Sequence, residues 1–151
     1  MITDVFSSAL KWLNEKSELW MAEAHYGRKQ RTLYPDTPDE LMVRINHAMI
    51  RQKHYKDPDI TIGKLCDLYK VNRSYLSRAI QTVYGIHFCA WVNIFRVEEA
   101  KRLIQEKRTG PLDLYDLAYQ CGFNSTRSFT RVFSANVHCT PMQYYKKEQA
   151  K

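Results

Sequence analysis

Two short segments of this 151-residue chain combine arginine and hydroxyl side chains at helical spacing. The first segment holds Arg73, Ser74, Ser77 and Arg78, and the second holds Thr126, Arg127, Thr130 and Arg131. Residues three and four positions apart share one face of an α-helix, so each set would form a polar, cationic strip. A guanidinium group donates two parallel hydrogen bonds to paired acceptors, such as guanine O6 and N7 or two phosphate oxygens. The spacing therefore favours recognition of an anionic partner that is rich in acceptors.

Each strip belongs to a longer segment, and the two segments repeat each other about fifty residues apart. Leu65-Cys66 matches Leu117-Ala118, Asn72 matches Asn124, and Ser77-Arg78 matches Thr130-Arg131. Similarity at a fixed interval indicates one structural unit used twice, and each copy is typical of a helix-turn-helix with an asparagine opening its second helix. In this motif the second helix enters the major groove of DNA, and its early residues meet the base edges. We therefore expect the eight residues of the two strips to contact DNA bases.

Some polar residues are expected to contact the DNA backbone, because half or more of all protein–DNA hydrogen bonds go to phosphates and sugars. The residues expected to contact phosphate are Asn72, Arg96, Asn124, Ser125, Ser128 and Lys146. Arg96 has an alternative interpretation as the internal ion-pair partner of Glu99 or Asp67. For Arg78 and Arg131, a phosphate contact or a solvated charge is the alternative to a base contact.

The excess positive charge lies in the part of the chain that contains the repeat. Residues 61–147 hold 13 Lys or Arg against 6 Asp or Glu, a surplus that equals the net charge of +7 of the whole chain. Duplex DNA carries one negative charge per roughly 1.7 Å of its axis, so a basic surface of this kind suits it. A basic protein without a nucleic-acid partner is the alternative that charge alone leaves open.

Helix start signals and breaks in periodicity place the elements that would carry the strips. Thr37-Pro38-Asp39-Glu40 combines a cap, a proline at the first helical position and a glutamate three residues after the cap, which is typical of a helix start. The expected elements are a first helix-turn-helix at about 62–84, a linker helix at about 87–107 and a second helix-turn-helix at about 114–135. A further capping box, Thr140-Pro141-Met142-Gln143, predicts a short helix near the end of the chain.

Helical periodicity also predicts which apolar side chains are buried. The expected core residues are Ile62, Leu65 and Leu68 in the first unit, and Trp91, Phe95, Phe129 and Phe133 further along. The linker helix would be roughly 30 Å long at 1.5 Å per residue, while one turn of B-DNA is about 34 Å. A rigid helix of that length could hold two recognition helices in successive major-groove segments on one face of the DNA.

Residues 61–147 resemble the DNA-binding domain of AraC/XylS-type bacterial transcription regulators. The motifs that carry the resemblance are Val71-Asn72-x-x-Tyr75-Leu76-Ser77-Arg78, Gly85-Ile86-x-Phe88, Arg96-Val97-x-x-Ala100-x-x-Leu103-Ile104, Ala118-x-x-x-Gly122-Phe123-Asn124-Ser125, Ser128-Phe129-x-Arg131-x-Phe133 and Thr140-Pro141-x-x-Tyr144. The resemblance implies an all-α fold of two helix-turn-helix subdomains, homeodomain-like three-helical units, joined by the long linker helix. Lys70 and His138 depart from the family pattern, because they stand where glycine is common, and a left-handed Lys70 would cost roughly 1 kcal/mol.

The resemblance implies a sequence-specific DNA-binding transcription regulator whose DNA-binding domain occupies residues 36–151. Residues 1–35 are expected to form a helical extension and a linker, and the usual effector-binding domain is not expected, because the 60 residues before Thr61 are too few for it. The expected partners are double-stranded DNA, RNA polymerase and, through residues 1–35, a second copy of the chain. The alternative function is a protein-interaction or oligomerisation module of a larger regulator, which would leave the charge of residues 61–147 unexplained.

Enzyme, metal and membrane functions find little support in the sequence. It contains no phosphate-cradling glycine loop, no H-E-x-x-H and no nucleophile elbow, so we predict no catalytic residue and no cofactor. His138, Cys139 and Cys121 lack the paired spacing of a zinc site, so no metal site is predicted. No apolar run approaches the ~20 residues that a membrane helix needs, and we expect a cytoplasmic protein with reduced cysteines and no membrane partner.

Overall fold

The computed structural model describes residue 11, residues 37–107 and residues 109–151, and every regular element from residue 37 onward in that part of the chain is helical. The described residues form two compact units. The first unit contains residues 37–53 and Thr61–Phe88, and the second contains His54–Ile60 and Cys89–Lys151. The predicted all-α fold is confirmed. The extension expected over residues 1–35 lies, apart from residue 11, outside the described residues.

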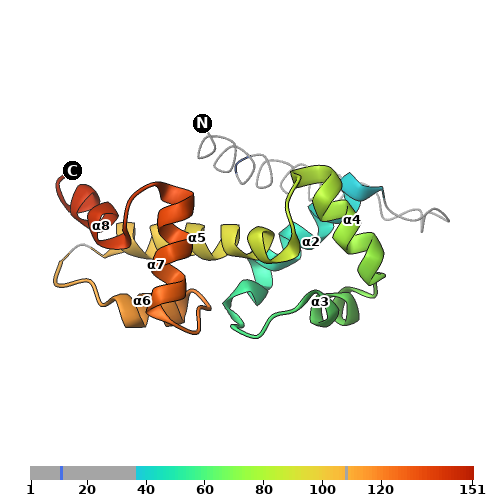
Figure 1. Ribbon diagram of the computed structural model, residues 1–151, viewed down its shortest axis with the longest axis horizontal. Coiled ribbons are helices and arrows are strands. Elements are labelled where there is room, and N and C mark those ends of the chain that lie inside the picture. The colour runs from blue at the N-terminus through green and yellow to red at the C-terminus, as the bar shows by residue number, and fades with distance from the viewer. Residues whose placement is uncertain (1–10, 12–36, 108) are drawn as a thin grey trace. The chain divides into compact units, whose positions relative to one another are not determined.

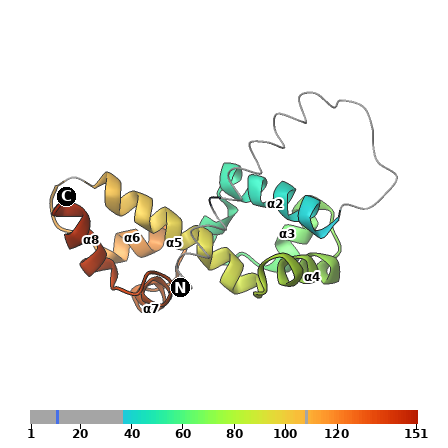
Figure 2. The ribbon, with the colours of Figure 1, turned by 90° about the horizontal axis from the view of Figure 1, so that it is seen from above.

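The first unit consists of three helices, α2 (Pro38–Gln52), α3 (Ile62–Tyr69) and α4 (Arg73–Tyr84), of which α2 and α3 each pack against α4 (Figure 1 and Figure 2). The capping box expected at Thr37 is confirmed. The Thr37 N–H donates to Oε2 of Glu40 at 2.8 Å, and the Glu40 N–H donates to Oγ1 of Thr37 at 3.3 Å. Two of the backbone donors at the start of α2 are thereby satisfied by side chains.

The core of the first unit joins side chains from all three helices. The fully buried residues are Leu41, Met42, Ile45 and Met49 of α2, Leu65 of α3, and Leu76 and Ile80 of α4. Asn46 is also fully buried, and its Nδ2 donates a hydrogen bond to the Tyr84 hydroxyl at 2.7 Å, which ties α2 to α4. The expectation that Leu68 is buried is wrong, because its side chain is 56% exposed. The buried stripe of α3 is centred on Leu65 and Cys66, and Leu68 falls to the side of it.

The second unit contains the short 3-10 helix η1 (His54–Lys56), α5 (Phe88–Glu106) from Cys89 onward, α6 (Leu114–Gln120), α7 (Thr126–Val137) and α8 (Pro141–Gln149). Its central cluster consists of Val97, Ala100 and Ile104 of α5, Leu117 and Ala118 of α6, Cys121 and Phe123 of the following turn, and Phe129 and Phe133 of α7. Trp91 and Phe95 of α5 are buried as well, so all four aromatic residues predicted for the core are confirmed.

The second unit also shows how α8 closes the cluster. Phe129 and Phe133 lie with ring centroids 5.7 Å apart, and Phe133 meets Tyr144 of α8 edge-on at 5.7 Å. The capping box expected at Thr140 is present, since its hydroxyl accepts from the Gln143 N–H at 3.2 Å and the Gln143 side chain accepts from the Thr140 N–H at 2.8 Å. Among the described helices, none combines the length and the hydropathy that a bilayer crossing requires.

Candidate nucleic-acid interface

The first cationic strip lies on the exposed face of α4. The helix begins after Asn72, because the Asn72 Oδ1 accepts hydrogen bonds from the N–H groups of Ser74 and Tyr75 at 2.9 and 3.2 Å. The buried face of α4 carries Leu76, Ala79 and Ile80. All four residues of the expected strip, Arg73, Ser74, Ser77 and Arg78, are exposed. The structure therefore brings the first set together on the solvent side of one helix.

The second strip lies on α7, whose cap differs from the expected one. Ser125 caps this helix, since its Oγ accepts from the Ser128 N–H at 3.2 Å, and Asn124 lies one residue before the cap. The prediction that an asparagine opens both second helices is therefore wrong for α7. Phe129 and Phe133 bury the inner face of the helix, while Arg127 and Arg131 are exposed. Thr126 and Thr130, the other two members, are half-buried.

The shifted cap places the two strips in the same register. The left-handed turn residues Lys70 and Gly122 are 52 positions apart, whereas the caps at residues 72 and 125 are 53 positions apart. The second turn is thus one residue longer. Each strip residue then matches its counterpart 53 positions later, so Arg78 corresponds to Arg131 and Ser77 to Thr130. Both helices present hydroxyl and guanidinium groups at the same distance from a side-chain cap.

Both turns are closed by the same hydrogen bond. The Val71 N–H donates to the carbonyl of Cys66 at 3.2 Å, and the Phe123 N–H donates to the carbonyl of Ala118 at 3.0 Å. In the first turn Lys70 adopts φ 54° and ψ 45°, which confirms a left-handed residue at this position. His138, the other departure from the family pattern, is left-handed as well, with φ 58°.

Arg96, expected as a phosphate contact, is half-buried and has internal partners. Its Nε donates to the carbonyl oxygen of Tyr55 at 2.8 Å and its Nη2 to that of Asp57 at 2.9 Å. Its Cζ lies 5.3 Å from the centre of the Phe123 ring. Burial lowers the pKa of this guanidinium group. The sequence suggests only the carboxylates of Glu99 and Asp67 as internal partners, because main-chain carbonyls some 40 positions away leave no signal in it.

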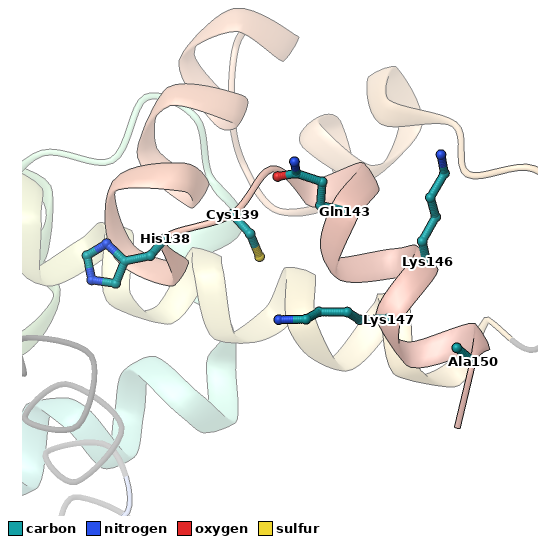
Figure 3. A pocket seen from close by; sticks show the side chains of 6 residues that line it. All are labelled: His138, Cys139, Gln143, Lys146, Lys147 and Ala150. Atoms are coloured by element: carbon teal, nitrogen blue, oxygen red, sulfur yellow. The ribbon is translucent and has the colours of Figure 1, made fainter.

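The other expected phosphate contacts lie at the start of a recognition helix or on α8. Asn72, Asn124 and Ser125 are exposed, and Ser128 is half-buried. Lys146 lies on α8 beside a shallow hollow of about 580 Å³ (Figure 3). The residues that line the hollow are His138, Cys139, Gln143, Lys146, Lys147 and Ala150. Figure 3 shows Lys147 extending towards Cys139, whereas the side chain of Lys146 extends in a different direction. In the part of the chain that the structure describes, no group of three potential metal ligands comes together.

The structure also exposes two tyrosines that the expected contact set does not include. Tyr119 and Tyr115 lie four positions apart on α6, and their side chains are 72% and 74% exposed. Both line a smaller hollow that continues to Ser125 and Thr126 at the start of α7. Their spacing, opposite the buried Leu117 and Ala118, is the sequence signal that could have identified them. The tyrosine hydroxyls add hydrogen-bonding groups beside the second strip.

The fold and the two cationic strips define a class of protein, the all-α domains with two helix-turn-helix units. Residues 65–147, more than half of the chain, match a family model described as a helix-turn-helix domain. The chain belongs to the AraC-type helix-turn-helix family. The resemblance to AraC/XylS-type DNA-binding domains that the sequence motifs carry is thereby confirmed.

Relatives of known sequence match a little over half of the chain. An uncharacterized HTH-type transcriptional regulator of Staphylococcus aureus (strain COL) is 33% identical over 87 residues, which are 57% of this chain and 11% of the relative. The HTH-type transcriptional regulator YijO of Escherichia coli (strain K12) is 28% identical over 85 residues, which are 56% of this chain and 29% of YijO. The chain thus spans about a tenth of the first relative and less than a third of the second.

Solved structures share the fold. The C-terminal domain of the two-component response regulator yesN from Fusobacterium nucleatum superposes with a TM-score of 0.56 at 28% identity, covering 68% of this chain and 96% of that domain. The DNA-binding domain of AdpA, determined in complex with a target DNA, superposes with a TM-score of 0.59 at 21% identity, covering 77% of this chain and 96% of that domain. The AdpA match supports the fold alone.

Proposed function

We propose that this chain is a sequence-specific transcription regulator that binds double-stranded DNA and reads two successive major-groove segments, one with α4 and one with α7. The observation that carries the proposal is the common register of the two strips behind their caps at Asn72 and Ser125. A buried apolar face on each helix leaves only the polar, cationic face for a partner. This is the arrangement that a helix-turn-helix uses to reach base edges.

In this proposal the eight strip residues contact bases. Arg78 and Arg131 each donate two hydrogen bonds to the O6 and N7 of a guanine, and Ser77 and Thr130 contact bases with less selectivity. The remaining members are Arg73, Ser74, Thr126 and Arg127. α5 has 19 residues and is therefore about 28 Å long, close to the ~34 Å of one turn of B-DNA. This length supports the proposal that it connects readers of neighbouring groove segments.

The proposed phosphate contacts are Asn72, Asn124, Ser125, Ser128 and Lys146, and Arg96 is no longer among them, because Tyr55 and Asp57 already accept its hydrogen bonds. The side-chain oxygen of Asn72 already accepts two backbone hydrogen bonds, so its Nδ2 group is the donor left for a phosphate. The backbone N–H groups at the start of each recognition helix favour an anion as well. Lys146 contributes a point charge on an exposed stem.

Competition binding by the full chain tests this proposal. A labelled duplex taken from sequence selection is displaced either by unlabelled duplex of the same sequence or by a scrambled duplex, at several salt concentrations. The binding constant should fall as the salt concentration rises, because Lys146 and the arginines of the two strips displace counterions from the DNA. Equal competition by the scrambled duplex would rule out sequence-specific binding.

RNA polymerase and a second copy of the chain, bound through residues 1–35, are also proposed partners, and the cytoplasm is the proposed location. We propose no enzymatic activity. Sedimentation of the chain with and without residues 1–35 tests the self-association. A monomer in both cases would remove the second copy from the set of partners.

A further inference from the structure

One short segment belongs to the second unit although its place in the sequence is inside the first. His54–Ile60 connects α2 to α3, yet it clusters with Cys89–Lys151. We call residues 54–57 the docked segment. The side chain of Tyr55 is only 6% exposed, and its ring stacks on Phe95 of α5 with 5.8 Å between the centroids. The docked segment is thus packed into the core of the second unit.

Polar contacts fix the docked segment on α5. Arg96 donates to the carbonyl oxygens of Tyr55 and Asp57 at 2.8 and 2.9 Å, so one guanidinium group holds the main chain at two places. The Nζ of Lys56 lies 2.7 Å from Oε1 of Glu99, whose side chain is only 5% exposed. The buried Glu99 carboxylate needs cationic partners, and it has two, Lys56 and Arg102, whose Nη2 lies 2.9 Å from Glu99 Oε1. The forked arginine is specific in geometry, because its two hydrogen bonds fix both the position and the orientation of the main chain.

The docked segment also touches the turn between α6 and α7. A Cβ atom on Gly122 would lie 2.5 Å from the carbonyl oxygen of Tyr55 and 2.9 Å from the Cα of Lys56. The next residue of the turn, Phe123, has its ring 5.3 Å from the guanidinium carbon of Arg96. Arg96 therefore contacts the docked segment and the turn at once.

This turn sets the start of the second recognition helix. The Phe123 N–H donates to the carbonyl of Ala118 at 3.0 Å, and the Phe123 ring packs 5.3 Å from that of Phe129 on α7. The cap residue Ser125 follows two positions later, and Arg127 of the strip lies in the first turn of the helix. Because packed elements move together, a displaced turn would move the strip residues relative to the DNA.

The first helix-turn-helix has a different turn. The residue equivalent to Gly122 is Lys70, which carries a full side chain and is exposed. A Cβ is therefore accommodated in the first turn, whereas the backbone of the docked segment occupies that space in the second. The turn before α7 is thus packed against the docked segment, whereas the equivalent position in the turn before α4 is exposed.

We propose that the docked segment, through Lys56 and Arg96, positions the second recognition helix, so that the base preference of α7 depends on residues located before the first helix-turn-helix. Lys56 and Arg96 act as positioning residues, since they do not contact the bases and affect base recognition only by holding the turn that precedes α7. The inference rests on the proposed function, because base preference is one of its readouts. Amide hydrogen exchange provides a second readout that needs no DNA.

The experiment compares Lys56→Met and Arg96→Lys in the full chain with a matched control, Lys101→Met. The control breaks the Lys101–Glu98 pair, which also lies on α5 and has a similar distance of 2.8 Å, but which does not involve the docked segment. Each variant is used to select duplexes from a random library. The selected duplexes should contain two short blocks of preferred sequence, one read by α4 and one by α7. In both test variants the preference for the block read by α7, the block that Arg131→Ala relaxes, should fall about tenfold, while the preference for the other block stays unchanged. The control should keep both blocks, and Lys56→Arg should restore the wild-type preference.

Amide exchange separates this inference from the proposed function. In Arg96→Lys the Gly122 and Phe123 amides should exchange about tenfold faster than in the wild type, while the amides of α4 keep their rates. Unchanged exchange at these two amides, or a loss of preference shared equally by both blocks, would overturn the inference. If the wild type selects no sequence at all, the proposed function fails, and the exchange rates alone decide whether the docked segment holds the turn.

Discussion

Lys70 and Gly122 occupy the same position in the two helix-turn-helix turns, and both are left-handed, with φ values of 54° and 87°. Their surroundings differ. Lys70 is exposed, whereas Gly122 is buried against the main chain of Tyr55 and Lys56. The same left-handed conformation is thus adopted by a lysine in the first turn, where the side chain makes it strained. In the second turn it is adopted by a glycine, where a side chain would collide with main-chain atoms.

Lys70→Gly is expected to stabilise the protein by about 0.5–1 kcal/mol, because glycine removes the left-handed strain at a modest cost in unfolded-state entropy. Chemical denaturation measures the change in the free energy of unfolding. As a control, Thr82→Gly in the exposed last turn of α4 should destabilise by roughly 0.3 kcal/mol, because threonine is itself a poor helix former. A destabilising Lys70→Gly would show that the lysine side chain makes contacts that outweigh the backbone strain.

Gly122→Ala is expected to destabilise the second unit by about 3 kcal/mol or more, since the new Cβ meets backbone atoms that cannot move aside and the left-handed conformation adds strain. The matched control is Gly63→Ala in α3, where the nearest atom to a Cβ is Thr61 Oγ1 at 3.7 Å. That substitution should stabilise by about 0.5–1 kcal/mol. Similar free energies of unfolding for the two variants would contradict the close approach at Gly122.

Arg78→Ala and Arg131→Ala should each weaken binding to the preferred duplex by about 1–3 kcal/mol and relax the preference at different base pairs. The reason is that each guanidinium is exposed on its own recognition helix and matches the acceptors of a guanine. Titrations on preferred and random duplexes measure the effect, with Lys101→Ala as a control of equal charge. Equal losses on the two duplexes would identify these arginines as phosphate contacts.

Glu99 should make the stability of the second unit depend on pH in the acid range. Hydrogen bonds from Arg102 and Lys56, opposed by burial, lower the pKa of Glu99 from 4.5 to about 2. A lowered pKa contributes stability that is complete above pH 4.5 and is lost as the pH falls towards 2. Glu99→Gln should therefore cost about 2–3 kcal/mol at pH 7, a difference that shrinks on acidification.

The control for Glu99 is its neighbour Glu98, which pairs with Lys101 at 2.8 Å in a more exposed position. Glu98→Gln should change the free energy of unfolding by less than about 1 kcal/mol at pH 7. Urea denaturation between pH 2 and pH 7 measures both variants. A constant difference between the wild type and Glu99→Gln over this range would contradict the account of the Glu99 pair.

The sequence predicts well what depends on neighbouring residues. Helix caps are local, and those expected at Thr37, Asn72 and Thr140 are all present. The grouping of the strip residues on one face is predicted correctly as well, because it depends only on their helical spacing. For α7 the repeat predicts a cap at Asn124, one residue too early, because the two turns differ in length by one residue. Ser125, which forms the cap, is as good an acceptor for a helix start as asparagine.

The features missed from the sequence depend on distant contacts. The docked segment follows α2 directly, and nothing in its residues indicates packing against α5. Arg96 finds its acceptors 39 and 41 positions away, on main-chain atoms that every residue carries. The apolar side chain of Leu68 predicts burial, but the packing of α3 buries the face centred on Leu65 and leaves Leu68 exposed.

Selection from a random duplex library with the full wild-type chain tests the central claim most directly. Two recognition helices that read neighbouring groove segments should enrich two short blocks of sequence whose centres lie about ten base pairs apart. Arg78→Ala should relax one block and Arg131→Ala the other. A single enriched block, or two blocks at a spacing far from one helical turn, would contradict the account.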